Sequence, residues 1–232
     1  MILLSGVALL LSLIACQHRS FPTMTIFDDP SRFVRLEVNR TVGGGHAHPA
    51  DITTDEMIAV LSGVMIEEPP GFLRSLSLST KGDEPRQHPA FNEAEISFFA
   101  PFLAEGLKTA KSDQIVTFGQ TSQKAAFLEI ASGGMLVTSG GLFINGDELH
   151  LILGNYRSPA NYAPDPGIGA TLDGRSAPLQ PIAPQRTTLY FEPTTAVAPS
   201  RKSFLSRLLG PDRHEIVVLF KQLAAGTVKS VK

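Results

Sequence analysis

The sequence predicts an α+β fold with a mainly antiparallel sheet, a central hairpin, and helices packed on one face of the sheet. Two runs of strand-forming residues flank Asn145-Gly146, which is a strong short-range hairpin signal. Apolar stripes with helical spacing occur elsewhere, and they do not alternate regularly with the predicted strands. We therefore expect a sheet built around residues 133–157 and covered by helices on one side.

The predicted hairpin has a well-defined core face. Leu142 and Ile144 fall on one side of the first strand, and residues of the second strand lie opposite them on the same side. A two-residue and a four-residue loop give the same facing, because side chains alternate along a strand. The opposing residues are Leu149, Leu151 and Leu153.

Length and composition limit the possible classes of protein. The chain has 232 residues, enough for one domain with its own core. The net charge of −2 gives no electrostatic argument for nucleic acid or for an anionic membrane surface. The chain has no Trp and three Tyr, which argues against an aromatic platform for sugars or bases. The single cysteine, Cys16, excludes an intramolecular disulfide and a cysteine-based metal site.

The N-terminus carries the most specific signal in the chain. Residues 2–14 are almost entirely apolar, shorter than the ~20 residues that span a bilayer as a helix. They suit the h-region of a signal peptide and end in Leu13-Ile14-Ala15-Cys16. This tetrapeptide resembles the bacterial lipobox. No Lys or Arg precedes the apolar run, so either the amino terminus supplies the positive charge or translation starts upstream.

The resemblance implies a lipoprotein. Residues 1–15 would be a signal peptide, and Cys16 would become the acylated first residue of the mature protein. A membrane partner follows from these acyl chains, and anchoring by several chains is stable. Gln17 in place of Asp after the cysteine favours the outer membrane, facing the periplasm. The alternative is a buried N-terminal helix with an incidental cysteine.

The chain after the anchor divides into a tether at residues 16–30 and one α+β domain at residues 31–232. Residues 32–39 alternate as a half-buried strand, with Arg35, Glu37 and Asn39 outward. A glycine loop follows. A capping box at Thr53–Glu56 predicts a helix that ends at Pro69-Pro70.

The middle of the chain contains the clearest helix start. Asn92 is the expected N-cap, with Glu95 three residues later, and Pro101 should kink or restart this helix. Further strands are expected at residues 72–79, 114–118 and 125–130.

The last part begins with a Pro- and Gly-rich loop at residues 158–186, which is unusually long for a compact domain. A strand at 187–192, a short helix at 203–209, and a final helix from the capping box at 212–215 to Gly226 are expected to follow.

Two clusters are candidates for chemistry or binding. His46, His48 and Asp51 lie in and beside the glycine loop and could supply three metal ligands. The serines near glycines at 132–141 lack the strand-to-helix elbow of a nucleophilic serine. Asn155, Tyr156 and Arg157 end the hairpin and lead into the long loop, where Tyr and Arg favour an interface.

The leading hypothesis is a non-catalytic envelope lipoprotein without a cofactor, which binds an envelope protein through its sheet edge and the loop at 158–186. The alternative is a metal-dependent hydrolase that uses His46, His48 and Asp51. Neither hypothesis involves nucleic acid.

Overall fold

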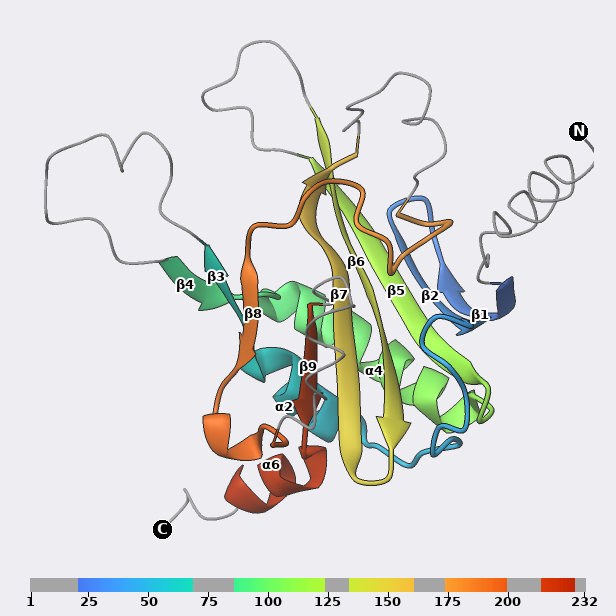
Figure 1. The fold of residues 1–232 in the computed structure, drawn as a ribbon, viewed down its shortest axis with the longest axis vertical. Coiled ribbons are helices and arrows are strands. Elements are labelled where there is room, and N and C mark those ends of the chain that lie inside the picture. Colours follow the sequence, from blue (N-terminus) through green and yellow to red (C-terminus); the bar gives the residue numbers. More distant parts are fainter. Residues whose placement is uncertain (1–20, 69–85, 124–133, 161–173, 200–213, 228–232) are drawn as a thin grey trace, which may run out of the picture.

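The computed structural model describes residues 21–68, 86–123, 134–160, 174–199 and 214–227. These residues form a large and a small antiparallel sheet and three α-helices (Figure 1). The large sheet contains, in spatial order, β1 (Phe21–Asp28), β2 (Arg32–Val38), β5 (Gln114–Gln123), β6 (Met135–Asn145), β7 (Glu148–Pro159) and β9 (Glu215–Val218). The strand that comes first in the described chain and the last one therefore form its two edges.

The remaining elements lie around this sheet. The small sheet has the order β4 (Arg86–Pro89), β3 (Val64–Glu68) and β8 (Thr188–Phe191). The helices are α2 (Thr54–Gly63), α4 (Glu93–Thr109) and α6 (Phe220–Thr227), and η2 (Thr194–Ala196) is a short 3-10 turn. Helices α2 and α4 lie on one side of the large sheet (Figure 1), and the main hydrophobic core fills the space between. The predicted α+β class is confirmed.

The central hairpin forms as predicted. Leu142 pairs with Leu151 and Ile144 with Leu149, and all four side chains are buried in the main core. Asn145 pairs with Glu148, so the loop has two residues and begins at Gly146, whose φ of 60° favours glycine.

Both predicted capping boxes that lie wholly in the described chain are present. The Asn92 side chain accepts the Glu95 N–H at 2.9 Å, and the Glu95 carboxylate accepts the Asn92 N–H at 2.8 Å. Thr53 and Glu56 form the same reciprocal pair at the start of α2. Helix α4 continues through Pro101, which we expected to kink or restart it.

Two predicted helices are partly strands. The helix after Thr53 ends at Gly63, and β3 follows because its residues pair with two other strands, β4 and β8. At Gly63 an added Cβ would lie 2.4 Å from the Glu192 carbonyl oxygen, so only glycine allows this close approach. The predicted helix start near residue 215 is likewise wrong. The β-branched run 216–218 forms β9 on the edge of β7, and α6 begins at Phe220.

Two further expectations need correction. The predicted tether contains a strand, because residues 21–28 form β1 and pair with β2. Glu37 and Asn39, predicted to face solvent, are buried, with exposures of 0% and 8%, and the Glu37 carboxylate accepts a hydrogen bond from the Arg35 guanidinium at 2.6 Å. The elements expected at 72–79, 125–130 and 203–209, and Cys16 itself, lie outside the described residues.

The cap of α4 gives a first test. Asn92→Ala should lower the free energy of unfolding by about 1 kcal/mol, because the Glu95 N–H loses its acceptor at the helix start. Urea denaturation followed by circular dichroism measures this change. Ser97→Ala, at an exposed position inside the same helix, is the control and should be close to neutral. An equal effect of the two substitutions would contradict the assigned cap.

Candidate functional site

The face of the large sheet opposite the helices is covered by the chain itself. Residues 174–186, here called the covering segment, pass across β5, β6 and β7 on the side away from α2 and α4 (Figure 1). The segment contains no helix or strand. It is the larger described part of the loop predicted at 158–186, whose first two residues instead end β7. Side chains of the hairpin fix its position.

Asn155 makes the most extensive of these contacts. It lies on β7 with an exposure of 0%. Its Oδ1 accepts the Ile182 N–H at 2.7 Å, and its Nδ2 donates to the Gln180 carbonyl at 2.8 Å and to Ser139 Oγ at 3.0 Å. The backbone groups of residues 180 and 182 have no partner strand in the described part of the chain. The buried Asn155 carboxamide takes the place of that strand by bonding both groups.

Two neighbouring side chains extend this attachment. Ser139 Oγ donates to the Pro178 carbonyl at 2.8 Å. Gln185 accepts the Tyr156 N–H at 3.1 Å and donates to Ser158 Oγ at 2.7 Å. Ser139 is fully buried and occupied by these contacts, consistent with the absence of a nucleophile motif around it.

Glycines on the hairpin let the covering segment approach the backbone of the sheet. A Cβ at Gly154 would lie 2.5 Å from the Pro178 carbonyl oxygen and 2.8 Å from backbone atoms of Leu179. A Cβ at Gly141 would lie 3.0 Å from Leu179 Cδ2. Leu179 packs against a small apolar cluster on this face, made of Ile115, Phe143, Ile152 and Val42.

The predicted binding residues at the hairpin exit separate into three environments. Asn155 is an internal attachment point and is not available to a partner. Tyr156 is 7% exposed and belongs to the main core, with its hydroxyl 3.5 Å from His88 Nδ1, and burial raises its pKa. Arg157 is exposed, with its guanidinium 5.3 Å from the Tyr156 ring centroid. Of the three, only Arg157 has a side chain that solvent can reach freely.

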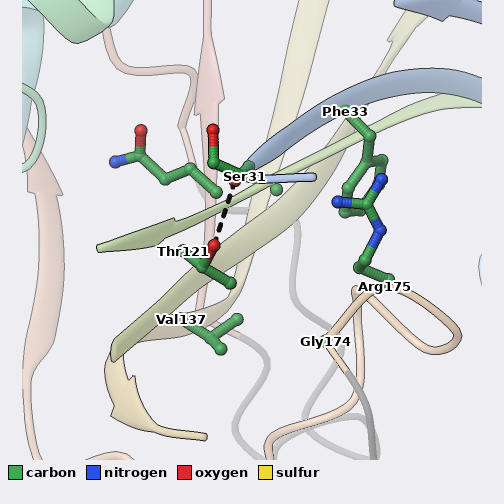
Figure 2. Close-up of a pocket in the computed structure, with 8 residues that line it drawn as sticks. Ser31, Phe33, Thr121, Val137, Gly174 and Arg175 are labelled. Atoms are coloured by element: carbon green, nitrogen blue, oxygen red, sulfur yellow. Dashed lines mark hydrogen bonds between the residues drawn. The ribbon is translucent and has the colours of Figure 1, made fainter. Parts of the chain in front are cut away.

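A small hollow lies on the same face, between Phe33, Val137 and the start of the covering segment (Figure 2). The enclosed space in it is about 20 Å³, which is room for about one water molecule and not for a larger ligand. The guanidinium of Arg175 lies 5.2 Å from the Phe33 ring centroid, donates to the Asp29 carbonyl at 2.9 Å, and pairs with Asp28. Arg175 thus ties the covering segment to the turn between β1 and β2.

The glycine loop that carries the two candidate histidines continues the hydrogen bonding of the sheet where the pairing of β5 with β6 ends. Beyond Leu142, β6 has no partner on β5, and the glycine loop takes that place. Ala47 N–H donates to the Ile144 carbonyl at 2.7 Å, and the Ile144 N–H donates to His48 Nε2 at 3.0 Å. The His48 ring therefore acts as the acceptor that a strand carbonyl would provide. Because Nε2 accepts, the neutral ring carries its proton on Nδ1.

His46 packs beside His48 rather than forming a ligand set with it. Its ring lies 4.4 Å from Phe143 and 5.6 Å from His48, between centroids, and its Nδ1 is 3.3 Å from Asn145 Oδ1. Asp51 is exposed. Among the described residues, no group of three His, Cys, Asp or Glu side chains could hold a metal ion. The structure does not bring His46, His48 and Asp51 together as a metal site.

Burial gives His48 an unusual proton affinity. Removal of the ring from water, together with the positive charge of a protonated His46, lowers the pKa of His48 from 6.5 to about 4. The protonated ring could not accept the Ile144 N–H. His48 is therefore neutral in the folded protein at neutral pH, where its function is structural.

The sequence contained only indirect signals for the attachment of the covering segment. Gln185 and Arg175 lie in a Pro- and Gly-rich region whose composition predicts an irregular loop but not its docking. Closely spaced glycines in β6 indicate a close backbone approach, without naming the segment that approaches. Within the part of the chain that the structure describes, no helix is long and apolar enough to cross a membrane.

Comparisons with protein-family models, with curated proteins and with solved structures found no match to this chain.

Asn155 provides a second test. Asn155→Ala should cost about 2–4 kcal/mol of unfolding free energy, because it leaves buried backbone groups of residues 180 and 182 without partners. Hydrogen exchange should speed up at the Ile182 amide before the sheet amides are affected. Gln180→Ala is the matched control, since it removes an exposed side chain on the same segment but keeps the carbonyl. Unchanged exchange at Ile182 in the Asn155 variant would refute the proposed attachment.

His48 provides a test by pH. Its folded pKa of about 4 lies below the unfolded value near 6.5, so the stability contributed by the neutral ring is complete above pH 6.5 and is lost as pH falls towards 4. Between pH 7 and 4.5 the native protein should lose roughly 2 kcal/mol more than His48→Gln, which cannot titrate there. Urea denaturation at both pH values measures this difference. Parallel pH profiles for the two proteins would show that His48 is not the titrating group.

Proposed function

We propose that this protein is a lipid-anchored component of a bacterial cell envelope and that its domain is a binding or structural module. The observation that carries the proposal is a coincidence at the N-terminus. An apolar run at residues 2–14, the small residue Ala15 and the only cysteine of the chain follow one another in the order of a lipobox. Acyl chains on Cys16 would hold the protein in the membrane, and Gln17 favours the outer membrane, facing the periplasm.

The start of the folded domain is consistent with an anchor at this position. Strand β1 begins at Phe21, five residues after Cys16. At ~3.3–3.6 Å per residue, the intervening chain spans at most about 18 Å. A protein acylated at Cys16 would therefore hold its domain at the membrane surface.

Two observations support a binding role: buried polar side chains hold the backbone in place, and the covering segment presents an ordered outer surface. His48, Ser139 and Asn155, which are the side chains best placed for chemistry, all hold the backbone in place. The attached segment presents a fixed outer surface with several exposed residues. A surface that is ordered before binding loses less conformational freedom when a partner binds. The exposed residues of the segment are Ser176, Gln180, Pro181, Pro184 and Arg186.

The anchor is tested by the cysteine. In a bacterial host, Cys16→Ser should abolish acylation and leave an unprocessed precursor, because the thiol that receives the lipid is gone. Intact mass spectrometry and membrane fractionation give the readout. Ser5→Ala, in the apolar run and away from the lipobox, is the control and should be processed and acylated normally. Normal cleavage and membrane partitioning of the Cys16 variant would exclude the lipoprotein assignment.

The binding surface is tested in the native envelope. A photo-crosslinking residue placed at Gln180 or Arg186 of the acylated protein should capture the same envelope protein from both positions. The same residue at Ser97, exposed on α4 on the other side of the sheet, is the control and should not capture it. Identical products from all three positions would contradict binding through the covering segment.

A further inference from the structure

Strand β1 carries an apolar line that the rest of the domain covers only in part. Two irregularities in the pairing of β1 with β2, between Pro22 and Met24 and between Thr25 and Phe27, each add one residue to β1. As a result, every third residue of β1 faces the helix side of the sheet. Phe21 pairs with Val38, Met24 with Leu36 and Phe27 with Val34, and Leu36 and Val34 belong to the main core.

Only one end of this line is covered. The ring of Phe27 lies 5.0 Å from Phe98 and 4.8 Å from Phe102 of α4, between centroids. Met24 is 49% exposed and Phe21 is 60% exposed, the largest value among the exposed large hydrophobic side chains in the described part of the chain. The exposure increases along β1 towards its N-terminal end, which is the end nearest to Cys16.

From this arrangement we infer that Phe21 and Met24 insert into the lipid surface to which the chain is anchored. The inference rests on the proposed anchor at Cys16. A tether of five residues holds both side chains within reach of the acyl chains, so their local concentration at the lipid surface is high. An aromatic and a flexible apolar side chain at the rim of a domain are suited to the boundary between headgroups and acyl chains.

A lipid surface suits this edge better than a further strand. The two bulges break the regular row of outward backbone groups that an added strand would pair with. Pro22 also lacks an N–H in this stretch. The irregular edge is thus protected against strand addition, while its apolar side chains remain exposed.

The charged side chains near Phe21 do not favour anionic lipid over zwitterionic lipid. Val38 pairs with both Phe21 and Gln114, so the residues that follow Val38 and precede Gln114 lie at the same end of the sheet. Exposed side chains there have both signs, with Arg40 and Lys111 beside Asp113. Insertion should therefore occur in zwitterionic lipid and should not require anionic lipid.

The absence of tryptophan from the chain allows a direct experiment. Phe21→Trp and Met24→Trp each introduce a unique fluorophore into the mature acylated protein, which is reconstituted in phosphatidylcholine vesicles with brominated acyl chains. Both should show blue-shifted emission and lose most of their intensity to bromine quenching. Met135→Trp is the matched control. Met135 is 47% exposed and pairs with Gln123 at the far end of β5, so its emission should remain unquenched.

The possible outcomes separate the two proposals. If mass spectrometry shows no lipid on Cys16, the proposed anchor itself fails. If Cys16 is acylated but tryptophans at 21 and 24 are quenched no more than the one at 135, the domain stands away from the bilayer and the insertion is refuted. Blue-shifted emission without quenching would also refute it, because a protein surface rather than lipid would then cover this edge.

Discussion

The buried carboxamide of Asn155 is the interaction on which the second face of the sheet depends. It satisfies one N–H and one carbonyl of a segment that has no strand or helix of its own, and it also binds Ser139 on the neighbouring strand. The segment that it holds places Leu179 against Phe143 and Ile152 on this face of the sheet. Asn155, supported by the contacts of Ser139, Gln185 and Arg175, thus holds a Pro-rich segment in place as a layer of the fold.

At the C-terminal end of β6, the glycine loop likewise bonds backbone groups that have no partner strand among the described residues. The pairing of β5 with β6 ends at Val116 and Leu142, so Ile144 has no partner on β5. His48 fills this position with a ring nitrogen that accepts a backbone N–H. A Lys or a protonated His could not do so, because the position requires an acceptor in a site shielded from water. In both regions, a buried side chain, Asn155 or His48, forms hydrogen bonds with backbone groups that have no partner strand.

The sequence predicted well those features whose cause is local. The Asn145-Gly146 turn, the facing of Leu142 and Ile144, and the capping boxes at Thr53 and Asn92 all depend on residues a few positions apart. The errors concern features decided by distant partners. Residues 215–218 have a helix-start signal and become a strand because the edge of β7 is free to pair. Glu37 alternates as a surface residue but is buried in the fold and paired with Arg35, which the alternation of its own strand does not reveal. Asn155 resembles a surface asparagine in sequence, because nothing local distinguishes an internal acceptor from a solvated one.

The order of strands in the large sheet also governs how the domain assembles. Strands β5, β6 and β7 are neighbours in sequence and in space, so they can pair early with little loss of chain entropy. Strand β2 ends at residue 38 and must wait for β5 at residue 114, while β9 joins β7 across more than fifty residues of chain. Non-local pairing of this kind slows folding. Both edges of the sheet therefore close late. The edge next to Cys16 is a local hairpin of β1 and β2, which can form early by the same reasoning. It joins the rest of the sheet only when β2 pairs with β5, so the part of the domain nearest the proposed anchor can fold as a separate unit before it docks.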